Sequence, residues 1–335
     1  MLAKLIVFVI TSGVMSGASW REIDTGLPGS AVGVIDLTID PTNPSTIYAR
    51  TDTAHGGAIF KSMDGGGSWT AISGIAGVSS LAIDPTNSST IYAGAGQGVV
   101  KSTNGGESWT SANTGLPSGS AGVLAVDPIT SSTLYTATFG GIFKSTNGGG
   151  NWSGMNTLPS NSFIQSLSID PLSPSTIYAV LNGAGGMGIL KTMDGGASWN
   201  AIHSSLSDAN TGVPCIICPL AIDPTTPSTI YAAGFGIVKS ADGGQSWKAV
   251  NTGIPTPVRP SGLSPGIPFP SLASIVSLSI DPITPSTIYA AYAVFGSGGV
   301  VKSTNGGTSW SVIGTPSNTS SGRGVQPGVS QPLIW

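Results

Sequence analysis

Four ionisable side chains in the first part of the chain could carry chemistry: Asp36 and Asp52 are the candidate catalytic residues, and Arg50 and His55 are candidate binding residues beside them. Two carboxylates beside a cation can have their pKa values pushed apart, so that one carboxyl donates a proton while the other stays ionised. Glycoside hydrolysis uses such a pair of carboxylates. The same residues also suit a binding cluster, or a structural ion network in which Asp36 and Asp52 pair with Arg50. The residue types alone leave catalysis, binding and structure open.

Two cysteines, Cys215 and Cys218, lie between prolines in the sequence Pro-Cys-Ile-Ile-Cys-Pro. In an exported protein we expect them to form a local disulfide that clamps their loop. Free thiols, a metal half-site and a redox pair are the alternatives. A metal half-site would find no second cysteine pair, and His55 and His203 are the two histidines of the chain. The thioredoxin-like setting of a redox pair is also missing. We therefore expect no metal and no cofactor.

Arg259 belongs to a proline-rich stretch between Trp247 and Asp281. A loop stiffened by proline can hold a partner at low entropic cost, which makes Arg259 a candidate binding residue. A spacer that covers one end of the domain would have the same composition, so both interpretations stand.

Two motifs recur six times and must position these candidates. The first reads Leu-x-Ile-Asp-Pro-x-x-Pro-Ser-Thr-Ile-Tyr-Ala, with the Asp–Tyr pairs Asp40/Tyr48, Asp84/Tyr92, Asp127/Tyr135, Asp170/Tyr178, Asp223/Tyr231 and Asp281/Tyr289. The second reads Lys-Ser-x-Asp/Asn-Gly-Gly-x-Ser-Trp, with the Lys–Trp pairs Lys61/Trp69, Lys101/Trp109, Lys144/Trp152, Lys191/Trp199, Lys239/Trp247 and Lys302/Trp310.

Each repeat supplies four short β-rich runs separated by turn residues, and no window has a sustained helical period. Units of about 40–45 residues with four strands are typical of a β-propeller, in which neighbouring blades bury one another's faces. The sequence therefore predicts an all-β propeller of six four-stranded blades. Ser19-Trp20-Arg21-Glu22 looks like an extra copy of the outermost strand, which would help to close the ring or belong to an incomplete seventh blade.

The spacings show which loops are free to vary. Asp to Tyr and Lys to Trp keep one spacing in all copies, whereas the segments from Tyr to Lys and from Trp to the next Asp differ in length. Because consecutive antiparallel strands turn at alternate ends, the two fixed turns share one face and the two variable loops share the other. Binding or catalysis is expected on the variable-loop face, where differences do not disturb the scaffold.

The second motif resembles the Asp-box, or bacterial neuraminidase, repeat Ser/Thr-x-Asp-x-Gly-x-Ser/Thr-Trp, and the likeness covers nearly the whole chain after residue 18. Aspartate alternates with asparagine at the box position, which suits a turn role because both side chains accept backbone N–H bonds. We expect these residues, with the box tryptophans, to be structural: Asp64, Asn104, Asn147, Asp194, Asp242, Asn305, Trp69, Trp109, Trp152, Trp199, Trp247 and Trp310. Families with this repeat include sialidases, xyloglucanase-type hydrolases, sortilin-type receptors and a photosystem II assembly factor, so the resemblance implies the fold and leaves the activity open.

The first repeat differs from the others. Its Tyr-Ala-Arg-Thr-Asp segment is similar to one near the start of xyloglucanase-type hydrolases, and the resemblance implies a catalytic Asp52. The other repeats carry no charge at the positions of Asp36, Arg50 and Asp52. Antiparallel pairing should bring Asp36 and Asp52 together on the variable-loop face. In that family, however, the second carboxylate comes from a second propeller, which this sequence does not contain. A sialidase site needs three arginines on one carboxylate, and the four arginines here are too scattered for it.

The composition argues against nucleic acid as a partner. Only 8% of residues are charged and the net charge is −3, so no basic stripe could follow a nucleic-acid backbone. Residues 1–18 read as a signal peptide, with one lysine before an apolar stretch and small residues at the cleavage site. No other stretch is long and apolar enough to span a membrane. We expect an exported protein (extracellular, periplasmic or cell-surface) with a propeller at 19–314 and a flexible tail or linker at 315–335.

The sequence thus favours a secreted binding or scaffolding module that presents its variable-loop face, with Arg50, His55 and Arg259, to a glycan or a protein. The alternative is a glycoside hydrolase that acts through Asp52 and Asp36. A third possibility is a protein like the photosystem assembly factor, which would have a specific membrane-protein partner.

Overall fold

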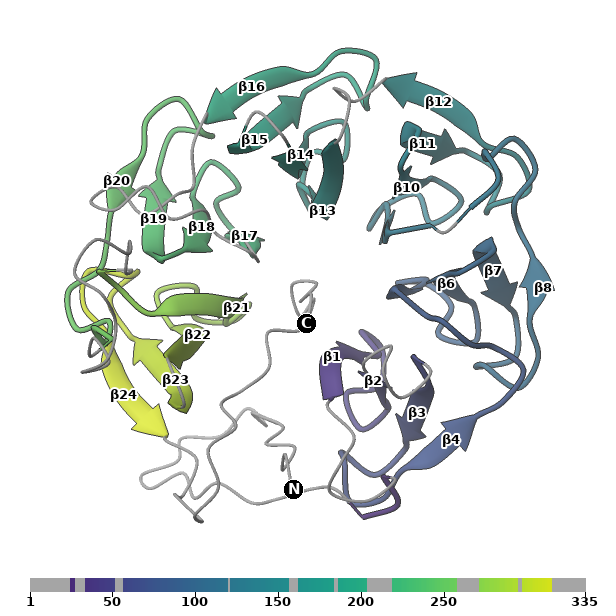
Figure 1. Ribbon diagram of the computed structural model, residues 1–335, viewed down its shortest axis with the longest axis horizontal. Helices are drawn as coiled ribbons and strands as arrows, with labels where there is room; N and C mark the ends of the chain where they lie inside the picture. Colours follow the sequence, from purple (N-terminus) through teal and green to yellow (C-terminus); the bar gives the residue numbers. More distant parts are fainter. Residues whose placement is uncertain are drawn as a thin grey trace, which may run out of the picture.

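The structure, a computed structural model, describes residues 25–27, 34–51, 57–119, 121–156, 162–183, 186–203, 219–257, 271–294 and 297–314. These residues form six antiparallel sheets of four strands, each with its strands in sequence order. The sheets stand as blades around a central axis (Figure 1). The predicted all-β propeller of six four-stranded blades is confirmed. The expected signal peptide, the extra strand at Ser19–Glu22 and the tail all lie outside the described residues.

The first strand of each blade lies next to the axis and lines the central channel. These inner strands are β1 (Val34–Ile39), β5 (Ser80–Ile83), β9 (Val123–Val126), β13 (Ser162–Ile169), β17 (Leu220–Ile222) and β21 (Ser274–Ile280). The second strands are β2 (Ile47–Thr51), β6 (Ile91–Ala95), β10 (Leu134–Thr138), β14 (Ile177–Gly183), β18 (Ile230–Gly234) and β22 (Ile288–Val294). Four of the second strands, β2, β6, β10 and β18, are buried at every position.

The third and fourth strands lie progressively further from the axis. The third strands are β3 (Ile59–Ser62), β7 (Gly98–Ser102), β11 (Gly141–Ser145), β15 (Gly186–Thr192), β19 (Gly236–Ser240) and β23 (Ser297–Ser303). The outer strands are β4 (Thr70–Ile72), β8 (Thr110–Ser111), β12 (Ser153–Asn156), β16 (Asn200–His203), β20 (Lys248–Ala249) and β24 (Ser311–Gly314). Figure 1 shows the outer strands along the rim of the molecule.

An aspartate fixes the turn between the first and second strand of each blade. In the first blade, the Asp40 carboxylate accepts hydrogen bonds from the backbone N–H groups of Thr42 (2.8 Å) and Asn43 (3.1 Å). Burial alone would raise the pKa of Asp40, but hydrogen bonds from Ser88, Thr42 and Asn43 outweigh it and lower the pKa below its usual value. The five other blades repeat this turn. The proline after each aspartate therefore always emerges at the same end of the molecule, which we call the Asp-Pro face.

A lysine and a tyrosine join each of the first five blades to the next. Each lysine ammonium lies over the ring of the tyrosine on the neighbouring strand, 5.2–5.5 Å from its centroid, an attractive cation–π arrangement. The ammonium also donates to a glycine carbonyl in the following blade, as Lys61 does to Gly105 at 3.1 Å. Burial and the nearby Asp40 raise the pKa of Tyr48 to about 12. We call this combination the Lys–Tyr latch.

Candidate functional site

The charged residues of the first blade form a buried pair on its two innermost strands. Asp36 of β1 and Arg50 of β2 are partners in the antiparallel register, next to an irregularity between Val34 and Asp36. A guanidinium nitrogen of Arg50 lies 3.7 Å from a carboxylate oxygen of Asp36. The Arg50 side chain is 5% exposed and the Asp36 side chain is 3% exposed. Arg50 also donates to the carbonyl of Val78 in the second blade, at 3.4 Å.

Burial and the charge of Asp36 have opposite effects on the pKa of Arg50. Burial lowers the pKa of Arg50 below its usual value, and the charge of Asp36 acts in the opposite direction by favouring the protonated guanidinium. The equivalent register pairs in other blades are uncharged, such as Ser80 with Gly94. Asp36 and Arg50 therefore form a charge pair where other blades have uncharged residues, and Arg50 links this pair to the second blade.

The remaining candidate site residues lie outside the described part of the chain. These residues are Asp52, His55, Cys215, Cys218 and Arg259. Their grouping on the variable-loop face, the disulfide between the cysteines and the catalytic role of Asp52 stay predictions. No helix within the described ranges has the length and apolar character needed to cross a bilayer.

The box turns, which are the segments that follow the third strand of each blade, show how aspartate and asparagine exchange. The Asp64 carboxylate accepts from the backbone N–H of Ser68 (2.9 Å) and from the hydroxyls of Ser68 and Ser62, both at 2.7 Å. Asn104 accepts the same backbone bond from Ser108 at 3.0 Å and donates its amide N–H to the Ser108 hydroxyl at 2.9 Å. The hydroxyl reverses its role, so either residue closes the turn.

These hydrogen bonds also set the acidity of the box aspartates. Bonds from Ser68 and Ser62 lower the pKa of Asp64 to about 2, and bonds from Ser246 and Ser240 lower that of Asp242 to about 2. Hydrogen bonds from Ser198 and Thr192 lower the pKa of Asp194 in the same way. A carboxylate that is held ionised by its own turn is a poor proton donor near neutral pH. The geometry is that of a turn, and the interpretation of these segments as Asp-box repeats stays a prediction.

The box tryptophans contribute apolar area on the outer side of each blade. Trp69, Trp152 and Trp310 are buried, and Trp109, Trp199 and Trp247 are half-buried. The indole N–H of Trp152 donates to the carbonyl of Ala112 in the preceding blade at 2.7 Å. The tryptophans therefore contribute to the contacts between blades.

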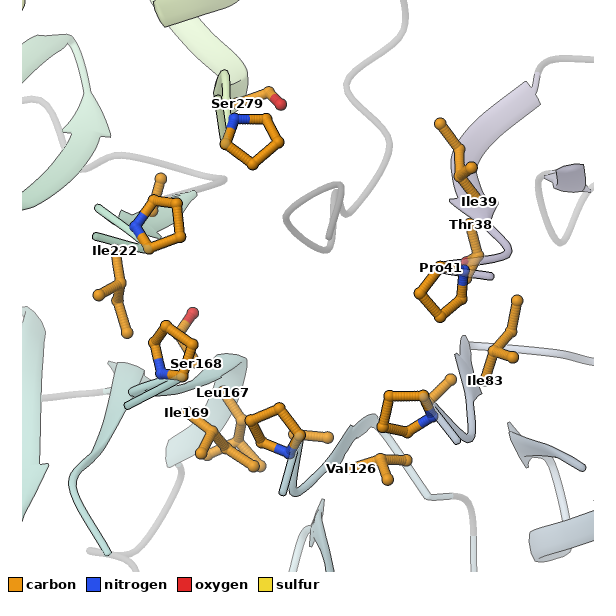
Figure 2. A pocket seen from close by; sticks show the side chains of 18 of the residues that line it. Thr38, Ile39, Pro41, Ile83, Val126, Leu167, Ser168, Ile169, Ile222 and Ser279 are labelled. Atoms are coloured by element: carbon orange, nitrogen blue, oxygen red, sulfur yellow. The ribbon is translucent and has the colours of Figure 1, made fainter. Parts of the chain in front are cut away.

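The central channel is a feature that the sequence analysis did not single out. It holds a cavity of about 340 Å³ at the Asp-Pro face, lined by the inner strands and by the six prolines that follow the turn aspartates. Figure 2 shows Pro41, Val126 and Ile222 around the same opening. The lining is mostly aliphatic, with Thr38, Ser168 and Ser279 among its polar members. The repeated Asp-Pro motif was the available signal, because one proline per blade at the inner end of a turn must form a ring.

Three exposed apolar side chains follow prolines of this ring. Ile129, Leu172 and Ile283 come directly after Pro128, Pro171 and Pro282 and are 62%, 63% and 77% exposed. Exposed aliphatic groups beside an apolar opening are typical of a surface that contacts another molecule. The Asp-Pro face is thus a candidate interaction surface as well as the scaffold's fixed end.

Comparisons with known proteins agree with this architecture. No family model and no curated protein matches the sequence, but solved structures do. A GH74 enzyme from Niastella koreensis is 20% identical, with a TM-score of 0.53 over 87% of this chain, which spans 60% of that enzyme. YCF48 from Cyanidioschyzon merolae is 17% identical, with a TM-score of 0.57 over 88% of both chains.

Two further solved structures are similar to this chain. YCF48 bound to D1 peptide is 16% identical, with a TM-score of 0.56 over 84% of this chain and 82% of that chain. The extracellular domain of the putative one component system BT4673 from B. thetaiotaomicron is 14% identical, with a TM-score of 0.58 over 93% of this chain and 36% of that one. At these identities the similarity shows the fold, and the chain is an all-β propeller with the architecture of the GH74, YCF48 and BT4673 structures.

Proposed function

We propose that this protein is an exported binding scaffold that holds a segment of a protein partner at the mouth of its central channel. The observation that supports this proposal best is the apolar opening at the Asp-Pro face, with its ring of prolines and the exposed Ile129, Leu172 and Ile283. An aliphatic lining with few hydrogen-bonding groups favours an apolar side chain over a sugar, which needs many polar contacts. The structure of YCF48 with a bound peptide is consistent with a peptide partner for this fold.

Hydrolysis is the less favoured alternative. The similarity to a GH74 enzyme is the reason to keep it. In this alternative, Asp36 and Asp52 are the two carboxylates of the reaction. In the structure the Asp36 side chain is 3% exposed and lies against Arg50. A carboxylate in that position is well placed to neutralise a buried cation and poorly placed to touch a substrate. A glycan or protein bound through Arg50, Asp52, His55 and Arg259 on the variable-loop face also stays a prediction.

A peptide-display selection against the purified protein tests the proposal. We expect peptides with aliphatic side chains to be enriched, and we expect Thr38→Trp, which fills the channel beside Pro41, to weaken their binding at least tenfold. Thr70→Trp, on the exposed strand β4, is the matched control and should leave binding unchanged. Equal binding by both variants would contradict the channel as the site.

A panel of polysaccharides separates the alternatives. Release of reducing ends that is lost in Asp52→Asn would make the protein a hydrolase. Glycan binding without hydrolysis that is lost in Arg259→Ala would assign the partner to the variable-loop face. We expect neither result.

A further inference from the structure

Three of the six box turns contain an asparagine that is followed directly by a glycine. These pairs are Asn104-Gly105, Asn147-Gly148 and Asn305-Gly306. A glycine has no side chain, so its backbone nitrogen can approach the side chain of the preceding asparagine closely. Asparagine is a thermolabile residue, and this sequence favours its loss by deamidation wherever the backbone is free to move. The structure of the turn therefore decides how long each asparagine lasts.

The reaction joins two atoms that the turn holds in place. In the second blade the backbone nitrogen of Gly105 forms a bond to the side-chain carbon Cγ of Asn104. Ammonia leaves with the Nδ2 nitrogen and the proton of the glycine amide. Water then opens the cyclic imide, which yields aspartate or, through the other carbonyl, isoaspartate. One water is taken up and one ammonia is released, so no oxidant, reductant or other reactant is needed.

Both reacting groups of the second blade are hydrogen-bonded in the folded turn. The backbone N–H of Gly105 donates to the carbonyl of Ser89 at 2.8 Å. The side-chain oxygen of Asn104 accepts from the hydroxyl of Ser102 at 2.9 Å and from the backbone N–H of Ser108 at 3.0 Å. The Asn104 amide also donates to the Ser108 hydroxyl at 2.9 Å. Attack requires the glycine nitrogen to leave its carbonyl and the asparagine side chain to leave these partners.

The third and sixth blades repeat this arrangement. Gly148 donates to the carbonyl of Ser132, and Gly306 donates to that of Ser286, both at 2.8 Å. In both blades the side-chain oxygen of the box asparagine accepts from a backbone N–H and from a serine hydroxyl at 2.8–2.9 Å. All three Asn-Gly pairs are therefore restrained in the same way.

The Lys–Tyr latch restrains each of these glycines from the preceding blade. Their carbonyls accept from lysine ammonium groups at 3.0–3.1 Å, the pairs being Lys61/Gly105, Lys101/Gly148 and Lys239/Gly306. The glycine nitrogen therefore becomes free only when the box turn separates from the blade before it. Such a separation is a local opening of the structure and does not require the whole molecule to unfold.

The fold already contains the product of the reaction at the equivalent positions. The first, fourth and fifth blades have aspartate before the box glycine, and these residues are Asp64, Asp194 and Asp242. Each carboxylate accepts the equivalent backbone N–H at 2.9 Å. A converted asparagine therefore finds its partners in place. Isoaspartate adds a carbon to the backbone, so it does not match the spacing of this turn.

We propose that Asn104, Asn147 and Asn305 are modification sites at which deamidation is controlled by the opening of contacts between neighbouring blades. The closed turn protects the asparagine and the open turn lets it react. An aspartate product closes the turn again and adds one negative charge to a chain whose net charge is −3. These sites lie in the box turns and not in the channel, so this proposal and the binding proposal can fail independently.

Peptide mass spectrometry of the full-length protein tests the protection. The protein is incubated at mildly alkaline pH in buffer alone and in concentrated urea, and conversion at each box asparagine is followed with time. We expect conversion in buffer to be at least about tenfold slower than in urea at all three sites. Asn182-Gly183 has the same dipeptide sequence and shows that the reaction proceeds in urea. Equal rates in buffer and urea at the box sites would overturn the proposal.

Two lysine variants test the control by the preceding blade. Lys61→Met removes the ammonium that binds the Gly105 carbonyl, so Asn104 should convert about fivefold faster in buffer while Asn147 keeps its rate. Lys101→Met is the matched variant and should accelerate Asn147 while Asn104 keeps its rate. Either variant is sufficient if the other does not fold. Conversion that is unchanged, or accelerated equally at both asparagines, would contradict the proposal.

The acceptance of the product is tested by thermal unfolding. Asn104→Asp should leave the melting temperature unchanged, because the carboxylate accepts the same bonds as the amide oxygen. Asn104→Leu has a side chain of similar size without these acceptors and should lower the melting temperature. If Asn104→Asp lowers it as much as Asn104→Leu does, the turn rejects the product and the proposal is wrong.

Discussion

At the scale of single residues, charge in this protein is used mainly to hold the scaffold together. The turn aspartates accept backbone N–H bonds, the box aspartates close turns, and the latch lysines bind carbonyls of the next blade. Asp36 and Arg50 are the exception, since no other blade has a charge pair at these register positions. Their burial suggests that each charge is tolerated because the other is present.

This dependence can be measured by exchanging the pair for the residues of another blade. Arg50→Met removes the cation that lies against the buried Asp36 carboxylate and should cost about 3–5 kcal/mol in the free energy of unfolding. The double variant Asp36→Ser with Arg50→Ala copies the register pair Ser277 and Ala291 of the last blade and should cost less than Arg50→Met alone. Urea unfolding of the three proteins provides the comparison. A double variant that is no more stable than Arg50→Met would show that the two residues act separately.

At the scale of strands and turns, the sequence was sufficient for most of the fold. The repeated Asp–Tyr and Lys–Trp spacings predict the blades correctly, because each turn is closed by residues inside its own motif. The burial of Arg50 was harder to predict from the sequence, since it depends on contacts with Val78 of the next blade as well as with Asp36. The channel also escaped the sequence analysis, because its ring of prolines forms only when six separate turns come together. Local patterns thus reveal elements, while contacts between blades require the assembled structure.

The connection between blades gives a prediction at this scale. Gly115, which follows the outer strand β8, has a φ of +90°, and a Cβ atom there would overlap the backbone carbonyl oxygen of Trp152. Gly115→Ala should therefore destabilise the protein by about 1–3 kcal/mol through backbone strain and lost contact. Gly96→Ala is the matched control, because Gly96 has open space around its Cβ position. Thermal unfolding of both variants distinguishes them, and equal melting temperatures would contradict the argument.

At the scale of the whole molecule, the blades behave as a linear series of repeats bent around an axis. We call the contact between two neighbouring blades a junction. Each blade between the first and the last is stabilised by two junctions, and each junction contains one hydrophobic cluster and one Lys–Tyr latch. The first and last blades each have one such junction among the described residues. In repeat proteins the stability of a unit depends on its nearest-neighbour interfaces, so the terminal units open most easily.

Amide hydrogen exchange should reveal this gradient directly. We expect the amides of β22 in the last blade to exchange about tenfold faster than those of β10 in the third blade, because local opening of a terminal blade breaks one interface instead of two. Strands β6 and β10, which both belong to blades with two neighbours, serve as the internal control and should be equally protected. Uniform protection of β22 and β10 would mean that the six blades open as one cooperative unit. A gradient would instead show that stability is added junction by junction, with the least protection in the blades that have one described junction.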